Sequence, residues 1–242
     1  MKIPQIKGII KRRILVNYRA EASVIQKILP AGMRPKLFEG KAIAGICLIR
    51  TEKIRPKGFP SMFGVASENA AHRIAVEWDE NGGKKEGGFI ARRDTDSIIN
   101  SLLGGKLFPG EHHKAEFDIA ERNGELTFSM ISDDADVSIS FSGELAQKLP
   151  ENSVFPTLQT ASDFFEAGSL GYSARKGSSD LDGLSLKISG WKVQPFDLKF
   201  VHSSFFDDLD IFPRDSVKFD HALFMENTHH EWLSAPDFNS NP

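Results

Sequence analysis

Residue types that could do chemistry gather shortly before the middle of the chain. The segment Ser67-Glu68-Asn69 precedes residues 71–78, where alternating apolar and polar residues indicate a β-strand. This alternation places His72 on one face with three large apolar residues, and Arg73 with Glu77 on the other. A closed sheet must point one set inward. The structural alternative is that Arg73 and Glu77 form a surface pair while His72 is an ordinary wall residue.

Glu68 is predicted to be inaccessible to solvent and hydrogen-bonded to an arginine. It lies between a short polar segment and a strand rich in apolar residues. A buried carboxylate without a partner would cost several kcal/mol.

Two consecutive arginines, Arg92 and Arg93, stand at the end of another short strand and precede Asp94-Thr-Asp-Ser97. A guanidinium can hold a carboxylate through two parallel hydrogen bonds, so one of these arginines could bind an anionic substrate. The alternative interpretation is the end of a strand followed by a helix cap.

Lys106 stands in the segment Gly104-Gly-Lys-Leu-Phe-Pro-Gly110, between two turn signals and beside two apolar side chains. A lysine that is removed from water loses proton affinity and becomes a usable amine nucleophile. Solvated loop lysines are far commoner, so the pattern alone is a weak signal.

The histidine pairs do not have the spacing of a metal site. Neighbours on a strand point to opposite faces, and neither His112-His113 nor His229-His230 has the i, i+4 spacing of a helical zinc motif. We therefore expect no bound metal. Nucleotide cofactors have no support either, because the chain lacks a P-loop, a dinucleotide Gly-x-Gly-x-x-Gly and a Gly-x-Ser-x-Gly motif.

Strands dominate the elements that must position these residues. Residues 115–145 predict a three-stranded meander, whose first hairpin turns at Asn123-Gly124. Further strands are expected at Arg13–Tyr18, Ala42–Ile49, Ala71–Trp78, Gly88–Arg92, Leu184–Ile188 and Trp191–Val201.

Short helices are expected at Glu21–Leu29, Asp96–Leu103 and Thr157–Glu166. Many strands without βαβ alternation favour an antiparallel barrel or sandwich with helices packed outside. No repeat or linker divides the sequence, so residues 1–242 are expected to form one domain.

Composition narrows the partners and the compartment. Thirty Lys and Arg against 33 Asp and Glu give a net charge of −3, without a basic block for nucleic acid. The single Cys47 cannot form an internal disulfide, which fits a reducing compartment, and its apolar run 42–49 suggests a buried role. That run is too short to cross a membrane, and the N-terminus does not have the pattern of a secretory signal. We expect a cytoplasmic protein that binds neither nucleic acid nor membrane.

The opening of the chain resembles acetoacetate decarboxylase and its relatives. The resemblance rests on Lys11–Arg19 ending in Tyr-Arg, a helix ending at Ile28-Leu-Pro30, and the apolar strand Lys41–Ile49. The whole chain resembles still more closely the YqjF-like (DUF2071) branch of that superfamily. The segments that carry this match are Ser67–Glu77, Gly104–Gly110, Gly171–Ser173, Ser203–Phe206 and His230–Trp232.

This resemblance implies a conical antiparallel β-barrel with an internal pocket, in which decarboxylases form a Schiff base through one lysine beside a second. Matched by segment, Lys106 lies nearest the reactive lysine, Glu68 falls on a family glutamate, and Arg12 or Arg13 falls near an arginine of the first strand. The chain departs from the pattern in having one lysine instead of two, and Gly45 or its neighbour instead of a second pocket glutamate.

The preferred hypothesis is a barrel that binds or converts a small oxo-carboxylate. As an enzyme it would be a Schiff-base lyase, in which Lys106 condenses with the carbonyl and Glu68 transfers protons. The expected substrate-binding residues are Arg12, Arg13, His72, Arg92 and Arg93. The competing hypothesis is a non-catalytic carboxylate-binding barrel, and a purely structural protein comes third. No cofactor is expected, and the oligomeric state, a homo-oligomer included, stays open.

Overall fold

The computed structural model describes residues 5–97, 110–174 and 180–239. Its elements are β1 (Ile6–Ala20), α1 (Ala22–Gln26), β2 (Arg34–Pro35), β3 (Leu37–Phe38), β4 (Lys41–Pro56), the 3-10 helix η1 (Ser61–Phe63), β5 (Val65–Glu80), β6 (Gly83–Thr95), β7 (His112–Arg122), β8 (Glu125–Ser132), β9 (Ser138–Leu145), α3 (Leu158–Ala167), β10 (Leu170–Ala174), β11 (Leu181–Ile188), β12 (Gln194–Ser203), α4 (Ser204–Asp207) and β13 (Val217–Phe238). The mainly β architecture predicted from the sequence is confirmed.

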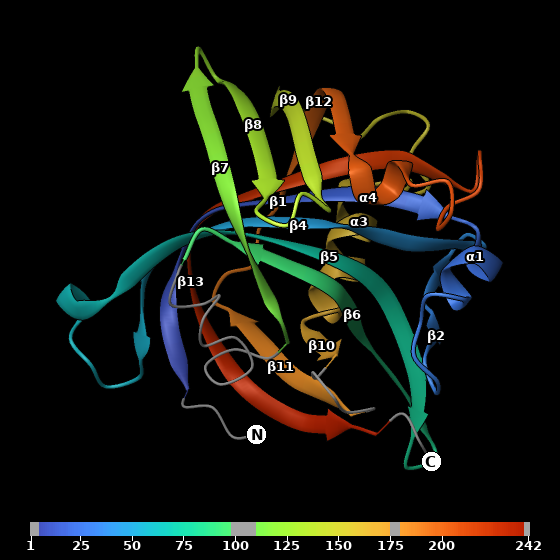
Figure 1. Ribbon diagram of the computed structural model, residues 1–242, viewed down its shortest axis with the longest axis horizontal. Helices are drawn as coiled ribbons and strands as arrows, with labels where there is room; N and C mark the ends of the chain where they lie inside the picture. The colour runs from blue at the N-terminus through green and yellow to red at the C-terminus, as the bar shows by residue number, and fades with distance from the viewer. Residues whose placement is uncertain (1–4, 98–109, 175–179, 240–242) are drawn as a thin grey trace.

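The strands pair into one sheet that returns on itself (Figure 1). Strands β6, β5, β4, β1, β13, β11 and β10 pair in that order, and β10 pairs again with β6, which closes a ring. On the other side, β7, β8, β9 and β12 connect β6 to β13. Most pairings are antiparallel, but β6 pairs in parallel with both β7 and β10. The segment between β6 and β7 is long enough for the crossover that a parallel pair requires.

Local signals in the sequence explain several element ends. Asn123 and Gly124 both have positive φ, 53° and 81°, as the tight turn between β7 and β8 requires. The Thr157 hydroxyl caps α3 by accepting a hydrogen bond from the Thr160 amide at 3.1 Å. These two elements were predicted correctly.

Other expected boundaries are corrected. The first helix is only α1, and Asp96 and Ser97 are not helical, while residues 98–103 lie outside the described ranges. β12 begins at Gln194 rather than at Trp191, whose indole instead donates to Ser162 of α3 at 2.9 Å. The short helix α4 was not expected.

Alternation along β1, β4 and β5 sends side chains to two different regions. Even-numbered residues such as Ile14, Ile46 and Ile74 join the main core. This core also contains Phe128 of β8, Phe141 of β9 and Phe206 of α4. Odd-numbered residues such as Leu15 and Cys47 face α3, where Phe164 and Phe165 pack against them. No helix within the described residues is long and apolar enough to span a membrane.

Candidate anion-binding site

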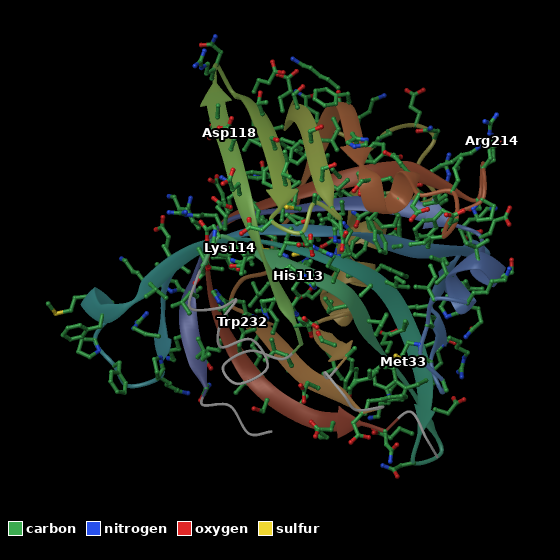
Figure 2. All side chains as sticks on the ribbon, viewed as in Figure 1. Met33, His113, Lys114, Asp118, Arg214 and Trp232 are labelled. Atoms are coloured by element: carbon green, nitrogen blue, oxygen red, sulfur yellow. The ribbon has the colours of Figure 1, made fainter. Side chains whose placement is uncertain are left out.

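A cavity of about 620 Å³ lies beside α3 on the odd-numbered face of β1, β4 and β5. Its apolar wall includes Ile49, Ile90, Phe165, Leu184, Trp191 and Trp232. Figure 2 labels Trp232 on β13, which belongs to the ring of strands. Small residues keep the space open, since Ala71, Ala75, Gly87, Gly88 and Gly171 also border it. The volume and the mostly apolar wall are typical of a site for a small organic molecule.

Arginines bring positive charge to this cavity. Arg13, Arg73 and Arg93 line it from β1, β5 and β6, and Arg55 of β4 also borders it. Arg55 donates to the backbone carbonyls of Phe59 and Lys53. Neither Arg13, Arg73 nor Arg93 has a carboxylate partner among the described residues, although buried charges are normally paired. The cavity therefore has positive charge available for a bound anion.

Arg73 is held from two sides. Its Nη2 donates to Asn17 Oδ1 at 2.6 Å, and its guanidinium lies 4.7 Å from the centre of the Phe165 ring. Its Nε is buried without a hydrogen-bond partner among the described residues. Burial lowers the pKa of Arg73 to about 10, so the side chain remains cationic at pH 7. Arg73 therefore brings a positive charge to the cavity wall.

Arg93 and Arg13 have neutral partners. The Nε and Nη2 of Arg93 donate to Ser173 Oγ at 3.2 and 3.1 Å, and burial lowers its pKa to about 10. Arg13 Nε donates to Cys47 Sγ at 3.2 Å, and its guanidinium lies 5.5 Å from the Trp191 ring centre. These contacts orient both side chains without cancelling their charge.

The acidic residues at the border of the cavity do not neutralise this cluster. Asp94 pairs with Arg92 at 2.9 Å, and Glu166 is exposed on α3. Lys36 also borders the cavity, but its ammonium is paired with Glu86 at 2.8 Å.

Glu68 is buried and bonded to an arginine, as the sequence predicted. Only 8% of the residue is exposed, and Arg12 Nη2 donates to both of its carboxylate oxygens at 3.0 and 2.8 Å. Burial raises the pKa of Glu68, although the positive charge of Arg12 opposes this effect. Glu68 does not line the cavity, however, because Ser67 and Asn69 face the cavity and strand alternation turns Glu68 away.

The remaining candidates are divided by the same alternation. Arg12 and Arg92 lie outside the cavity wall, and Arg92 donates to Asp134 as well as to Asp94. His72 points into the main core, where its ring lies 4.7 Å from that of Phe205. Of the expected site residues that the structure describes, Arg13 and Arg93 line the cavity, whereas Arg12, Arg92, His72 and Glu68 do not. Arg12 and Glu68 lie together outside it.

Arg73 lines the cavity although it was not among the expected substrate-binding residues, and the alternative in which it forms a surface pair with Glu77 is wrong. Glu77 pairs with Arg34 and Lys84 instead, at the far end of β5. The useful signal was the spacing of Arg73 between Ala71 and Ala75, since small residues on one strand face leave room for a ligand. Lys106 lies outside the described residues.

The histidine pairs separate as strand geometry requires. His112 lines the cavity and its Nδ1 lies 3.3 Å from the Gly110 carbonyl oxygen, whereas His113 Nδ1 lies 3.0 Å from Asp134. Burial, together with the nearby charge of Arg93, lowers the pKa of His112 to about 3. Figure 2 labels His113 on β7. Within the described ranges, no three His, Cys, Asp or Glu residues form a metal-binding group.

Comparison with solved structures shows which fold this is. An acetoacetate decarboxylase-like enzyme from Sphingomonas wittichii has a TM-score of 0.58 at 13% identity, covering 99% of this chain and 92% of that one. Acetoacetate decarboxylase from Legionella pneumophila has a TM-score of 0.60 at 13% identity, covering 98% of this chain and 89% of that one. The enduracididine biosynthesis enzyme MppR, complexed with pyruvate, has a TM-score of 0.57 at 11% identity, covering 96% of this chain and 89% of that one.

The sequence itself matches one family along almost its entire length. No curated protein matches it significantly. The model of DUF2071, a family described as uncharacterized conserved proteins, matches residues 10–232. The chain therefore belongs to the DUF2071 family and has the acetoacetate decarboxylase-like fold.

Proposed function

We propose that this protein binds a small oxo-carboxylate in the cavity beside α3, with its carboxylate held by Arg13, Arg73 and Arg93. The observation that carries the proposal is the convergence of these three guanidinium groups without a carboxylate partner among the described residues. Guanidinium groups bind carboxylates through strong, charge-assisted hydrogen bonds.

The rest of the wall supports a small organic acid rather than an inorganic anion. Aromatic and aliphatic side chains make up most of the lining, including Phe165, Trp191 and Trp232. Such a wall favours a ligand with an apolar body beside its charged group. The pyruvate complex of MppR is an example of an oxo-carboxylate on this fold, and it supports the choice of ligand class.

The proposal extends to a Schiff-base lyase in which Lys106 attacks the ligand's carbonyl group. The amine would add to the carbonyl carbon and water would leave, giving a protonated imine that accepts electrons from a breaking bond at the α carbon. Asp94 and His112, before and after the segment that contains Lys106, both line the cavity. Glu68 faces away from the cavity, so the proposal assigns no proton transfer to it. A cytoplasmic location also stays a prediction.

Ligand binding is tested by titrating the protein with pyruvate and related oxo acids while recording tryptophan fluorescence, because two tryptophans line the cavity. Saturable binding is expected, and it should weaken about 10- to 100-fold in Arg73→Met and Arg93→Met, since each change removes charge-assisted hydrogen bonds. The matched control is Arg50→Met, because Arg50 lies on the opposite face of β4 beside Glu68. Equal loss in the control, or no binding by wild type, would refute the proposal.

Borohydride trapping separates an enzyme from a binder. A lyase should give, after reduction, an adduct whose mass is that of the ligand minus one oxygen atom, because imine formation loses water and reduction adds two hydrogens. The adduct should map to Lys106 and be absent from Lys106→Arg. Saturable binding without any trapped adduct would support the non-catalytic carboxylate-binding protein instead.

A further inference from the structure

A row of side chains crosses four neighbouring strands and ends at Arg73. The register pairs His221 of β13 with Asn17 of β1, Asn17 with Gly45 of β4, and Gly45 with Arg73 of β5. Asn17 Oδ1 accepts from Arg73 at 2.6 Å, Asn17 Nδ2 lies 3.1 Å from His221 Nε2, and His221 Nδ1 lies 2.6 Å from Asp220 Oδ2. We call these residues the Asp220–Arg73 row.

Only one placement of protons satisfies every contact in the row. Arg73 can only donate, so the oxygen of the Asn17 amide must face it and the NH2 group must face His221. His221 Nε2 therefore accepts, which leaves the proton on Nδ1, where it is donated to Asp220. Burial lowers the pKa of His221, which agrees with a neutral ring.

The far end of the row is firmly anchored. Asp220 is 2% exposed and also accepts hydrogen bonds from Arg19 at 3.0 Å, Ser153 Oγ at 2.6 Å and the Val154 amide at 2.9 Å. Asn17 and His221 are both completely buried. With so many partners on Asp220, the position of its carboxylate determines the orientation of the two side chains that follow.

Gly45 makes the contact between Asn17 and Arg73 possible. A Cβ at this position would lie 2.3 Å from the Val16 carbonyl oxygen and 3.2 Å from Asn17 Oδ1. A side chain on β4 would therefore occupy the space through which the Asn17 amide reaches over to β5. The absence of a side chain at Gly45 thus leaves room for the hydrogen bond between Asn17 and Arg73.

We propose that Asp220, His221 and Asn17 are positioning residues that hold the Arg73 guanidinium against the cavity for anion binding. This inference rests on the proposed function, because it assigns a task to Arg73 in that site. The row acts on one side of the guanidinium and the Phe165 ring on another, while Arg73 Nε stays without a protein partner among the described residues. Without the row, Arg73 would have to be ordered by the ligand itself, at a cost in affinity.

A double-mutant cycle with pyruvate as the probe tests this inference. His221→Leu should weaken pyruvate binding about 5- to 10-fold in the wild-type background, and should have almost no effect in Arg73→Met. His221→Gln should restore most of the affinity, because its amide can accept from Asn17 and donate to Asp220. Equal loss in both backgrounds would mean a merely structural role and would overturn the inference.

The tautomer of His221 can be measured in the wild-type protein without a ligand, so this test does not depend on whether a variant folds. Long-range proton–nitrogen NMR spectra of the wild-type side chain should show a protonated Nδ1 and a bare Nε2. A protonated Nε2 would overturn the row. Pyruvate binding that depends on Arg73 but not on His221 would refute this inference alone, whereas no binding by wild type would refute the proposed function and the inference with it.

Discussion

The two faces of β1, β4 and β5 are built in opposite ways. On one face, fully buried aliphatic residues such as Ile14, Ile46 and Ile74 pack against aromatic side chains of the main core. On the other face, arginines and small residues border an open cavity. Because side chains alternate along a strand, one set of strands can supply both stability and a charged site.

The consecutive arginines show the same division at the scale of single residues. Arg12 is bound to Glu68 and Arg92 to Asp94, and both lie outside the cavity wall. The next residue in each pair, Arg13 or Arg93, lines the cavity and contacts a neutral side chain. The first member of each pair therefore contributes to an internal ion pair, and the second is available to a ligand.

The largest expected difference between the two faces is in stability. Phe141→Ala, in the packed core, should lower the free energy of unfolding by about 3–5 kcal/mol, because it leaves a cavity in close-packed surroundings. Ile90→Ala, in the wall of the existing cavity, should cost less, about 2 kcal/mol at most, because one side of Ile90 already lacks neighbours. Urea denaturation measures both, and equal losses would contradict the distinction between the faces.

The neighbouring arginines should also differ in their effect on stability. Arg12→Met should destabilise the protein by about 2–3 kcal/mol, because it removes the bidentate partner of buried Glu68. Arg13→Met should change stability by less than about 1 kcal/mol, because no carboxylate among the described residues loses its partner. Adding Glu68→Gln should recover part of the loss in Arg12→Met. An equal effect of the two arginine changes would show that the pairing does not distinguish them.

The packed face should make stability depend on pH through His72. Burial lowers its pKa to about 3, and neither ring nitrogen has a hydrogen-bond partner among the described residues. Below pH 6.5 the unfolded state binds a proton that the folded state does not, so stability falls as the pH falls. Between pH 7.5 and 5.5 the loss from His72 should be about 1.4 kcal/mol. His72→Phe should reduce the pH dependence by that amount, and an unchanged slope would contradict it.

The smallest expected effect concerns Cys47, which lines the cavity beside Arg13 and is the only cysteine in the chain. The anionic reagent iodoacetate should alkylate this thiol faster, relative to neutral iodoacetamide, than it alkylates a free thiol. We expect a change in this ratio of about 3- to 10-fold, because the arginines concentrate anions locally. Intact mass spectrometry measures both rates. Arg73→Met should lower the ratio, and a ratio like that of a free thiol would contradict a positive cavity.

Local sequence patterns predicted much of the sheet but only part of the site. The hairpin at Asn123-Gly124 and the alternation in β5 depend only on residues close together in the sequence, so both could be predicted from it. The pairing of Glu68 with an arginine also followed from the cost of a buried charge. Arg73 was missed because alternation shows that Arg73 and His72 face opposite ways, and does not show which face is hollow.

The sequence by itself determined the strands, the mainly β class and the opposite orientations of adjacent residues such as Arg12 and Arg13. These properties depend on short-range backbone geometry. Only the tertiary structure decided which face became the cavity, because that choice depends on β10, β11 and α3 closing over strands far away in sequence. The Asp220–Arg73 row likewise depends on the register of four strands, since a shift of one residue would turn each of its side chains to the other face.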